Sequence, residues 1–178
     1  GVVTAKILGM DFLDSDVFIQ NNENRKLQEI INKDGTESFL ETECKNILKI
    51  DVKNTVIATG GSVVLKDEAM KHLKKGAITV FLDVPLYDLK KRIYNTSDRG
   101  IAMKDGETID DIYRIRRPYY KKYADITVKT GHMSSRTAVG NQDYGRTALC
   151  SVIKQVSVTY EVIFAYTNGQ LKYNEAKK

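Results

Sequence analysis

The stretch Thr55-Val56-Ile57-Ala58-Thr59-Gly60-Gly61-Ser62 decides the fold. Its first five residues are mostly apolar or β-branched without polar alternation, a pattern typical of a strand buried on both faces of a parallel sheet. Two glycines follow directly, and at the carboxyl end of such a strand they let a ligand approach the backbone closely. The sequence therefore predicts a buried strand with a binding edge at Gly60 and Gly61, although a tight strand-to-helix turn accounts for the glycines equally well.

Helical and strand patterns alternate on both sides of this strand, which indicates an α/β domain with a parallel sheet. We expect further strands, listed in chain order, over Asp11–Asp16 (a strand or turn), Ala77–Leu82 and Ala124–Val128. We expect helices that end at Leu8 and that span Leu27–Ile31, Phe39–Leu48, Asp67–Lys75, Leu86–Tyr94 and Ile109–Tyr123. Gly9 suits a left-handed helix cap, and Asp34-Gly35-Thr36 interrupts the helical pattern between Ile31 and Phe39.

The composition of the chain changes after about residue 130. Residues 131–147 are small, polar and glycine-rich, which predicts a loop, whereas Val156–Thr167 is rich in β-formers. Asn168-Gly169 then favours a type I′ hairpin turn. We therefore divide the chain into a domain over 1–130 and a C-terminal extension over 131–178, whose hairpin either packs at an edge of the sheet or belongs to a separate element.

The overall composition predicts a soluble folded protein. The chain has 178 residues, 42% hydrophobic and 29% charged, and no apolar run reaches the roughly 20 residues that cross a bilayer. Its two cysteines suit a reducing cytoplasm. The net charge of +5 is compatible with nucleic acid and equally with an anionic small substrate. We expect a cytoplasmic monomer that acts on a small molecule, without a membrane or nucleic-acid partner.

Two further groups of residues suggest chemistry. Asp14 and Asp16 are two positions apart, so on an extended strand their carboxylates would share one face. Such a pair can hold Mg²⁺ or act as a general base, although an ordinary acidic turn has the same pattern. Arginine forks suit carboxylate and phosphate, and four arginines occur late in the domain: Arg99, Arg114, Arg116 and Arg117. A solvated helix face is the alternative for any one of them.

Together and in this order, these features resemble the shikimate kinase family. The family patterns G-x-x-x-A-x-x-L-G and F-x-D-x-D fit residues 1–16, and V-I-A-T-G-G-G fits residues 56–62 with Ser62 in the last place. The start of the family's G-E-x-x-F-R-x-x-E helix is similar to Gly35, Phe39 and Glu43. The lid arginine and the R-x-P-x-Y segment match Arg99 and residues 116–120.

The resemblance implies a three-layer α/β sandwich with a central parallel sheet, of the P-loop nucleoside monophosphate kinase type. It also implies transfer of the γ-phosphoryl group of ATP to the 3-hydroxyl of shikimate with Mg²⁺. Asp16 would hold the shikimate hydroxyls and favour loss of the proton, while Asp14 would support Mg²⁺. Gly60, Gly61 and Ser62 would lie against the substrate. Arg116 would grip its carboxylate, and Arg99 would stabilise charge on the phosphoryl group.

The chain departs from the family in two places. No G-x-x-x-x-G-K-[ST] loop occurs in the sequence, so we expect the strand and phosphate-binding loop of the family to be missing ahead of Gly1. That absence would impair transfer and leave a gap in the sheet. Leu40 stands where the family has a substrate arginine. The acceptor is therefore either shikimate or another polyhydroxylated acid, or the domain is a binding remnant without catalysis.

Overall fold

The computed structural model describes residues 1–93, 101–104, 106–129 and 162–166. Its helices are α1 (Val2–Leu8), α2 (Ser15–Glu23), α3 (Leu27–Ile47), α4 (Asp67–Leu73), α5 (Leu86–Ile93) and α6 (Ile109–Tyr123), with a short 3₁₀ helix η1 (Val63–Leu65). Its strands are β1 (Asp11–Asp14), β2 (Thr55–Ala58), β3 (Ala77–Asp83), β4 (Ile126–Lys129) and β5 (Val162–Tyr166). In these residues no helix has both the length and the apolar character to span a membrane.

Local backbone signals in the sequence are confirmed where helices end or bend. Gly9 closes α1 in the left-handed region at φ 65°. Gly35, at φ 83° and ψ 163°, kinks α3 between its two apolar stretches, so the expected interruption bends one long helix. α6 begins at a capping box, in which the Thr108 side chain accepts from Asp111 N–H. The sequence also predicts that Pro118 interrupts this helix; that prediction is wrong, since the helix continues through Pro118 to Tyr123.

The sheet has five strands in the order β1-β2-β5-β3-β4. β1 pairs with β2 in parallel, and β3 pairs with β4 in parallel. β5 is antiparallel to both of its neighbours, β2 and β3. The four N-terminal strands therefore all run the same way, as the sequence predicts, and their carboxyl ends meet at one edge.

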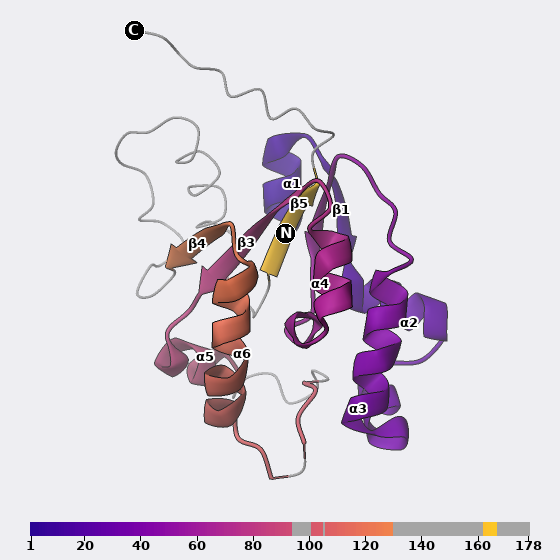
Figure 1. The fold of residues 1–178 in the computed structure, drawn as a ribbon, viewed down its shortest axis with the longest axis vertical. Helices are drawn as coiled ribbons and strands as arrows, with labels where there is room; N and C mark the ends of the chain where they lie inside the picture. Colours follow the sequence, from indigo (N-terminus) through magenta and orange to yellow (C-terminus); the bar gives the residue numbers. More distant parts are fainter. Residues whose placement is uncertain (94–100, 105, 130–161, 167–178) are drawn as a thin grey trace, which may run out of the picture.

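The extension supplies β5, which lies in the middle of the sheet rather than at an edge (Figure 1). Ile163 pairs with Ala58 of β2 on one side and with Val80 of β3 on the other. The expected gap in the sheet is therefore filled, and the backbone groups of β2 and β3 that face it are paired. The Asn168-Gly169 turn that the sequence predicts lies outside the described residues.

Alternating residues of the central strands form two cores, one on each face of the sheet. Val56, Val80 and Leu82 pack with Ala5 of α1, whereas Ile57 and Phe81 pack with α3, α4 and α6. Figure 1 views the molecule from the side of α4 and α6, with α1 behind the sheet. This helix–sheet–helix order is the three-layer α/β sandwich that the sequence predicts.

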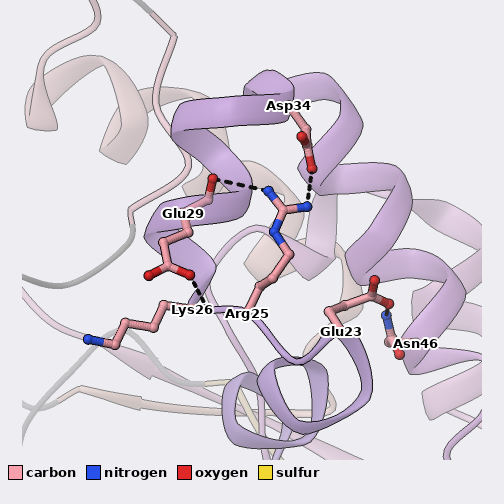
Figure 2. Close-up of polar contacts among 6 residues, drawn as sticks. All are labelled: Glu23, Arg25, Lys26, Glu29, Asp34 and Asn46. Atoms are coloured by element: carbon pink, nitrogen blue, oxygen red, sulfur yellow. Dashed lines mark hydrogen bonds and ion pairs between the residues drawn. The ribbon is translucent and has the colours of Figure 1, made fainter.

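Polar contacts fix α2 against α3 (Figure 2). These two helices carry Asp16 and Glu43. Arg25, just beyond α2, donates to Asp34 Oδ2 at 2.6 Å and to the Glu29 carbonyl at 3.3 Å. Asn46, which is fully buried, donates from Nδ2 to Glu23 Oε1 at 2.7 Å. The end of α2 is thus tied to both segments of α3.

The position of β5 predicts that the fold depends on it. Removing residues 162–178 would leave β2 and β3 with unpaired backbone edges inside the sheet, and unpaired polar groups there are costly. We expect this truncated chain to lose its cooperative thermal unfolding transition in circular dichroism. A chain that ends at Tyr166 is the control, because it keeps every described ladder. A cooperative transition in the shorter chain would show that β5 is dispensable.

Candidate active site

The candidate site begins where β1 and β2 end side by side. Asp14 ends β1 and caps α2, since its Oδ1 accepts the N–H groups of Asp16 at 2.9 Å and Val17 at 3.2 Å. The fully buried Ser15 accepts the Gly60 N–H through Oγ at 3.1 Å. The sequence predicts that the two aspartates share one face of a strand, and this prediction is wrong, because Asp16 already lies in the first turn of α2.

Gly60 is the point on which two carboxylates converge. A Cβ atom built on this residue would lie 2.7 Å from Asp16 Oδ1 and 3.0 Å from Glu43 Oε1. A side chain fits there only if the carboxyl group of Asp16 or Glu43 moves, so space and not backbone conformation favours glycine at this position. The site is thus a narrow acidic corner formed by α2, α3 and the end of β2.

Glu43 is the most buried acid of this corner, with 1% of its surface exposed. Its Oε1 accepts the Ser62 hydroxyl at 3.0 Å, and its Oε2 has no partner among the described residues. Burial, reinforced by the Asp16 charge, raises the pKa of Glu43 to about 8, while the Ser62 hydrogen bond and the Arg116 charge oppose that rise. Burial therefore favours the protonated form of Glu43.

The α6 helix closes the other side of the corner. Arg116 is 7% exposed, and its Nη2 donates to the Ala102 carbonyl. One turn further along, the Tyr120 hydroxyl donates to the Gly61 carbonyl at 2.5 Å, and its ring stacks on Phe81 with 5.1 Å between centroids. The glycine turn is thus held from α6 as well as from α2.

The structure brings Asp16, Gly60, Gly61 and Ser62 together, with Arg116 close enough for its charge to act on Glu43. The other arginines of α6 lie in different contacts. Arg117 makes a two-pronged ion pair with Asp83, through Nε at 3.0 Å and Nη2 at 2.7 Å. Arg114 pairs with Asp111 at 2.9 Å on the surface. Arg99 lies outside the described residues.

Leu40 is buried and forms part of an apolar cluster on α3. Its neighbours in that cluster come from α2, α3 and the segment before α6, namely Ile19, Leu27, Ile30, Phe39 and Ala102. The next residue, Glu41, turns outward and pairs with Lys66. Position 40 therefore contributes packing and no charge to the corner.

Sequence analysis missed the roles of Glu43, Ser15 and Tyr120 in building the corner. Glu43 carried a detectable signal, because Phe39, Glu43 and Ile47 repeat every four residues and place this acid on the buried face of α3. Ser15 and Tyr120 carried none, since their partners are backbone atoms of the distant residues Gly60 and Gly61.

The described residues form no cluster of three or more potential metal ligands. Asp14 fits a magnesium ion all the same, since one oxygen is used in the helix cap while the other has no partner among the described residues. Mg²⁺ is commonly bound through one or two carboxylates together with water and substrate phosphates, so Asp14 would supply one ligand among several.

The geometry defines an α/β domain with a group of buried polar side chains at the carboxyl ends of its parallel strands, the edge at which such sheets commonly bind ligands. A family profile for shikimate kinase matches residues 1–144. The shikimate kinase of Clostridium botulinum is 32% identical over 139 residues, which cover 76% of this chain and 82% of that protein. The chain belongs to the shikimate kinase family, whose activity is the phosphorylation of shikimate.

The chain is also similar to a solved structure and to part of a longer human protein. The solved structure "Shikimate kinase from Acinetobacter baumannii in complex with shikimate" has a TM-score of 0.68 at 25% identity, covering 86% of this chain and 82% of that one. The human protein "Threonine synthase-like 1" is 36% identical over 130 residues, 72% of this chain. Those residues are 18% of the human protein, so the chain spans less than a fifth of its length.

The narrowness of the corner predicts the effect of Gly60→Ala. The new methyl group would push Asp16 aside and overpack the space beside Glu43, at a cost of about 1 to 3 kcal/mol. We expect a lower thermal midpoint together with a shifted ¹³C carboxyl resonance of Asp16. Gly76→Ala is the control, because its φ of 72° strains any side chain while nothing lies within 4 Å. An unchanged Asp16 resonance in Gly60→Ala would contradict the close approach of the Asp16 carboxylate to Gly60.

Proposed function

We propose that the chain transfers the γ-phosphoryl group of ATP to the 3-hydroxyl of shikimate. The observation that carries the proposal is the convergence of Asp16 on Gly60 at the ends of two parallel strands. The hydroxyl groups of the acceptor would meet the Asp16 carboxylate at this edge of the sheet, where the carboxyl ends of parallel strands commonly bind ligands. Membership of the shikimate kinase family supports the choice of acceptor.

Asp16 is the residue we assign to proton removal. Its carboxylate would accept the hydrogen of the acceptor hydroxyl, which raises the nucleophilicity of that oxygen. The oxygen then bonds to the γ-phosphorus as the bond to the leaving ADP oxygen breaks, and the proton passes to Asp16. Asp16 is half-buried at the start of α2, so it is anchored by the helix and still accessible to a ligand.

Asp14 would hold Mg²⁺ through its free carboxylate oxygen. When bound, that ion neutralises charge on the phosphate oxygens, as in phosphoryl transfer generally. The chain's own contribution is the orientation of Asp14, whose other oxygen is fixed by two backbone N–H groups. The helix cap thus fixes the carboxylate in a single orientation.

The two arginines are proposed to recognise different charges, one on the acceptor and one on the phosphoryl group. Arg116, on α6, would bind the carboxylate of the acceptor with the guanidinium donors that Ala102 does not use. Arg99, outside the described residues, would approach the phosphoryl group as charge develops there. Much of the catalysis in such a site comes from positioning and from electrostatic stabilisation.

Leu40 favours a second candidate, in which the acceptor is a different polyhydroxylated acid. Its burial in an apolar cluster removes one charged contact with an acceptor carboxylate. Such a contact contributes about 1.5 to 3 kcal/mol, enough to change the preferred acceptor. Comparing the affinities of shikimate and other ring hydroxy acids separates the two candidates.

Asp16→Asn tests the proposed base. Because the amide cannot take the proton, we expect turnover in a coupled ADP-release assay to fall by on the order of 10² to 10⁴. Shikimate affinity in calorimetry should fall by roughly 10- to 100-fold, since hydrogen bonds to a charged group are lost. Asp11→Asn is the control, because Asp11 is exposed at the start of β1, the strand that leads into α2. Unchanged values in Asp16→Asn would remove Asp16 from the mechanism.

Arg116→Ala tests the recognition of the carboxylate. We expect the dissociation constant of shikimate to rise by roughly 10- to 100-fold, because a charge-assisted contact is lost. A ring polyol that lacks the carboxylate should bind the variant and the parent chain equally. Arg114→Ala serves as the control, since that side chain is 79% exposed and pairs with Asp111 on the same helix. Equal losses for the acid and the polyol would assign Arg116 a purely structural role.

A further inference from the structure

Tyr120 is a buried residue of α6 to which the phosphoryl-transfer scheme assigns no part. Its hydroxyl donates to the Gly61 carbonyl at 2.5 Å, and its ring stacks on Phe81 of β3 with 24° between the ring planes. Only 6% of its surface is exposed. A buried tyrosine hydroxyl usually has a hydrogen-bond partner, and here that partner belongs to the turn on which the site is built.

The glycine turn, residues 60–62, is held by a different helix at each of its three positions. Ser15 of α2 accepts the N–H at position 60, and Glu43 of α3 accepts the hydroxyl hydrogen at position 62. Between them, the carbonyl at position 61 accepts the hydroxyl hydrogen of Tyr120. Of the three helices, α6 is the one that also carries Arg116, the residue proposed to bind the acceptor carboxylate.

The spacing of Arg116 and Tyr120 brings both side chains to the same part of the molecule. They are four residues apart and buried, so they lie on one face of α6, about 6 Å apart along the helix axis. Pro118 between them has no N–H to donate, so this turn of α6 has one backbone hydrogen bond fewer. Contacts made outside the helix, including those of Tyr120, therefore help to hold this turn against the site.

We propose that Tyr120 is a positioning residue that sets the separation between Arg116 and the glycine turn, and thereby selects acceptors that contact both at once. The hydrogen bond to Gly61 stands on the geometry of the unliganded chain. Its consequence for recognition rests on the proposed function, in which Arg116 binds the carboxylate and Asp16 binds the hydroxyl groups. A ligand that contacts only one of these two side chains is insensitive to their separation.

The first test is the ¹³C carbonyl resonance of Gly61 in the full 178-residue chain without ligand. Tyr120→Phe keeps the ring that stacks on Phe81 and removes only the hydroxyl, so the core stays filled. We expect the Gly61 resonance to shift, because its carbonyl loses a hydrogen-bond donor. Tyr119→Phe is the matched control, since Tyr119 is the preceding residue and is 41% exposed. A Gly61 resonance that is the same in Tyr120→Phe and in the parent chain would overturn the proposal.

The second test is a double-mutant cycle on the dissociation constant of shikimate, measured by calorimetry. We expect Tyr120→Phe to raise this constant about 2- to 10-fold, the net effect of one hydrogen bond. In the Arg116→Ala background the separation no longer matters, so the same substitution should change the constant by less than about 2-fold. A ring polyol that lacks the carboxylate should bind Tyr120→Phe and the parent chain equally.

The possible results separate positioning from a general effect on the fold. Equal losses of shikimate affinity in both backgrounds, or equal losses for shikimate and the polyol, would overturn the positioning role. Failure of the parent chain to bind shikimate would overturn the proposed function and the role of Tyr120 in recognition. The Gly61 resonance would then still decide, in the unliganded chain, whether the Tyr120 hydroxyl holds the turn.

Discussion

The site depends on one constraint, the lack of a side chain at Gly60. Two carboxylates from different helices approach the same point above this residue, and any Cβ atom there would displace one of them. Two hydrogen bonds fix the backbone of this glycine turn. Ser15 Oγ accepts the Gly60 N–H, and the Tyr120 hydroxyl donates to the Gly61 carbonyl. The architecture of three layers supplies these groups from α2, α3 and α6, none of which could form the corner alone.

Local sequence pattern was sufficient for most of the fold. The β-branched run before Gly60, the left-handed Gly9 and the interruption at Gly35 each follow from backbone and side-chain preferences of nearby residues. The place of β5 could not be predicted in this way, because its partners β2 and β3 are set by which backbone edges remain unpaired in three dimensions. A β-rich segment has the same local pattern at an edge and in the centre of a sheet.

The candidate site was predictable in its residues and less so in its geometry. Asp16 and the glycine pair stand out in the sequence by type and spacing, and the family motif adds Arg116. The prediction that Asp14 and Asp16 share one face of a strand was wrong, because the strand ends at Asp14, which caps α2, and Asp16 belongs to that helix. Glu43 was recognised only as a motif position, since its character comes from burial and from a neighbour on another helix. The roles of Asp14 in holding Mg²⁺ and of Arg99 in stabilising the phosphoryl group stay proposals.

The central place of β5 has a consequence for the order in which the protein becomes structured. Ile163 pairs with Ala58 and Val80, so the middle of the sheet joins segments that are far apart along the chain. Contacts of such long separation are slow to form, because a large loop must close before they contribute any stability. On the ribosome, the sheet cannot be completed until the residues of β5 have emerged from the exit tunnel. Until then β2 and β3 would present open edges, and open strand edges favour pairing with other chains.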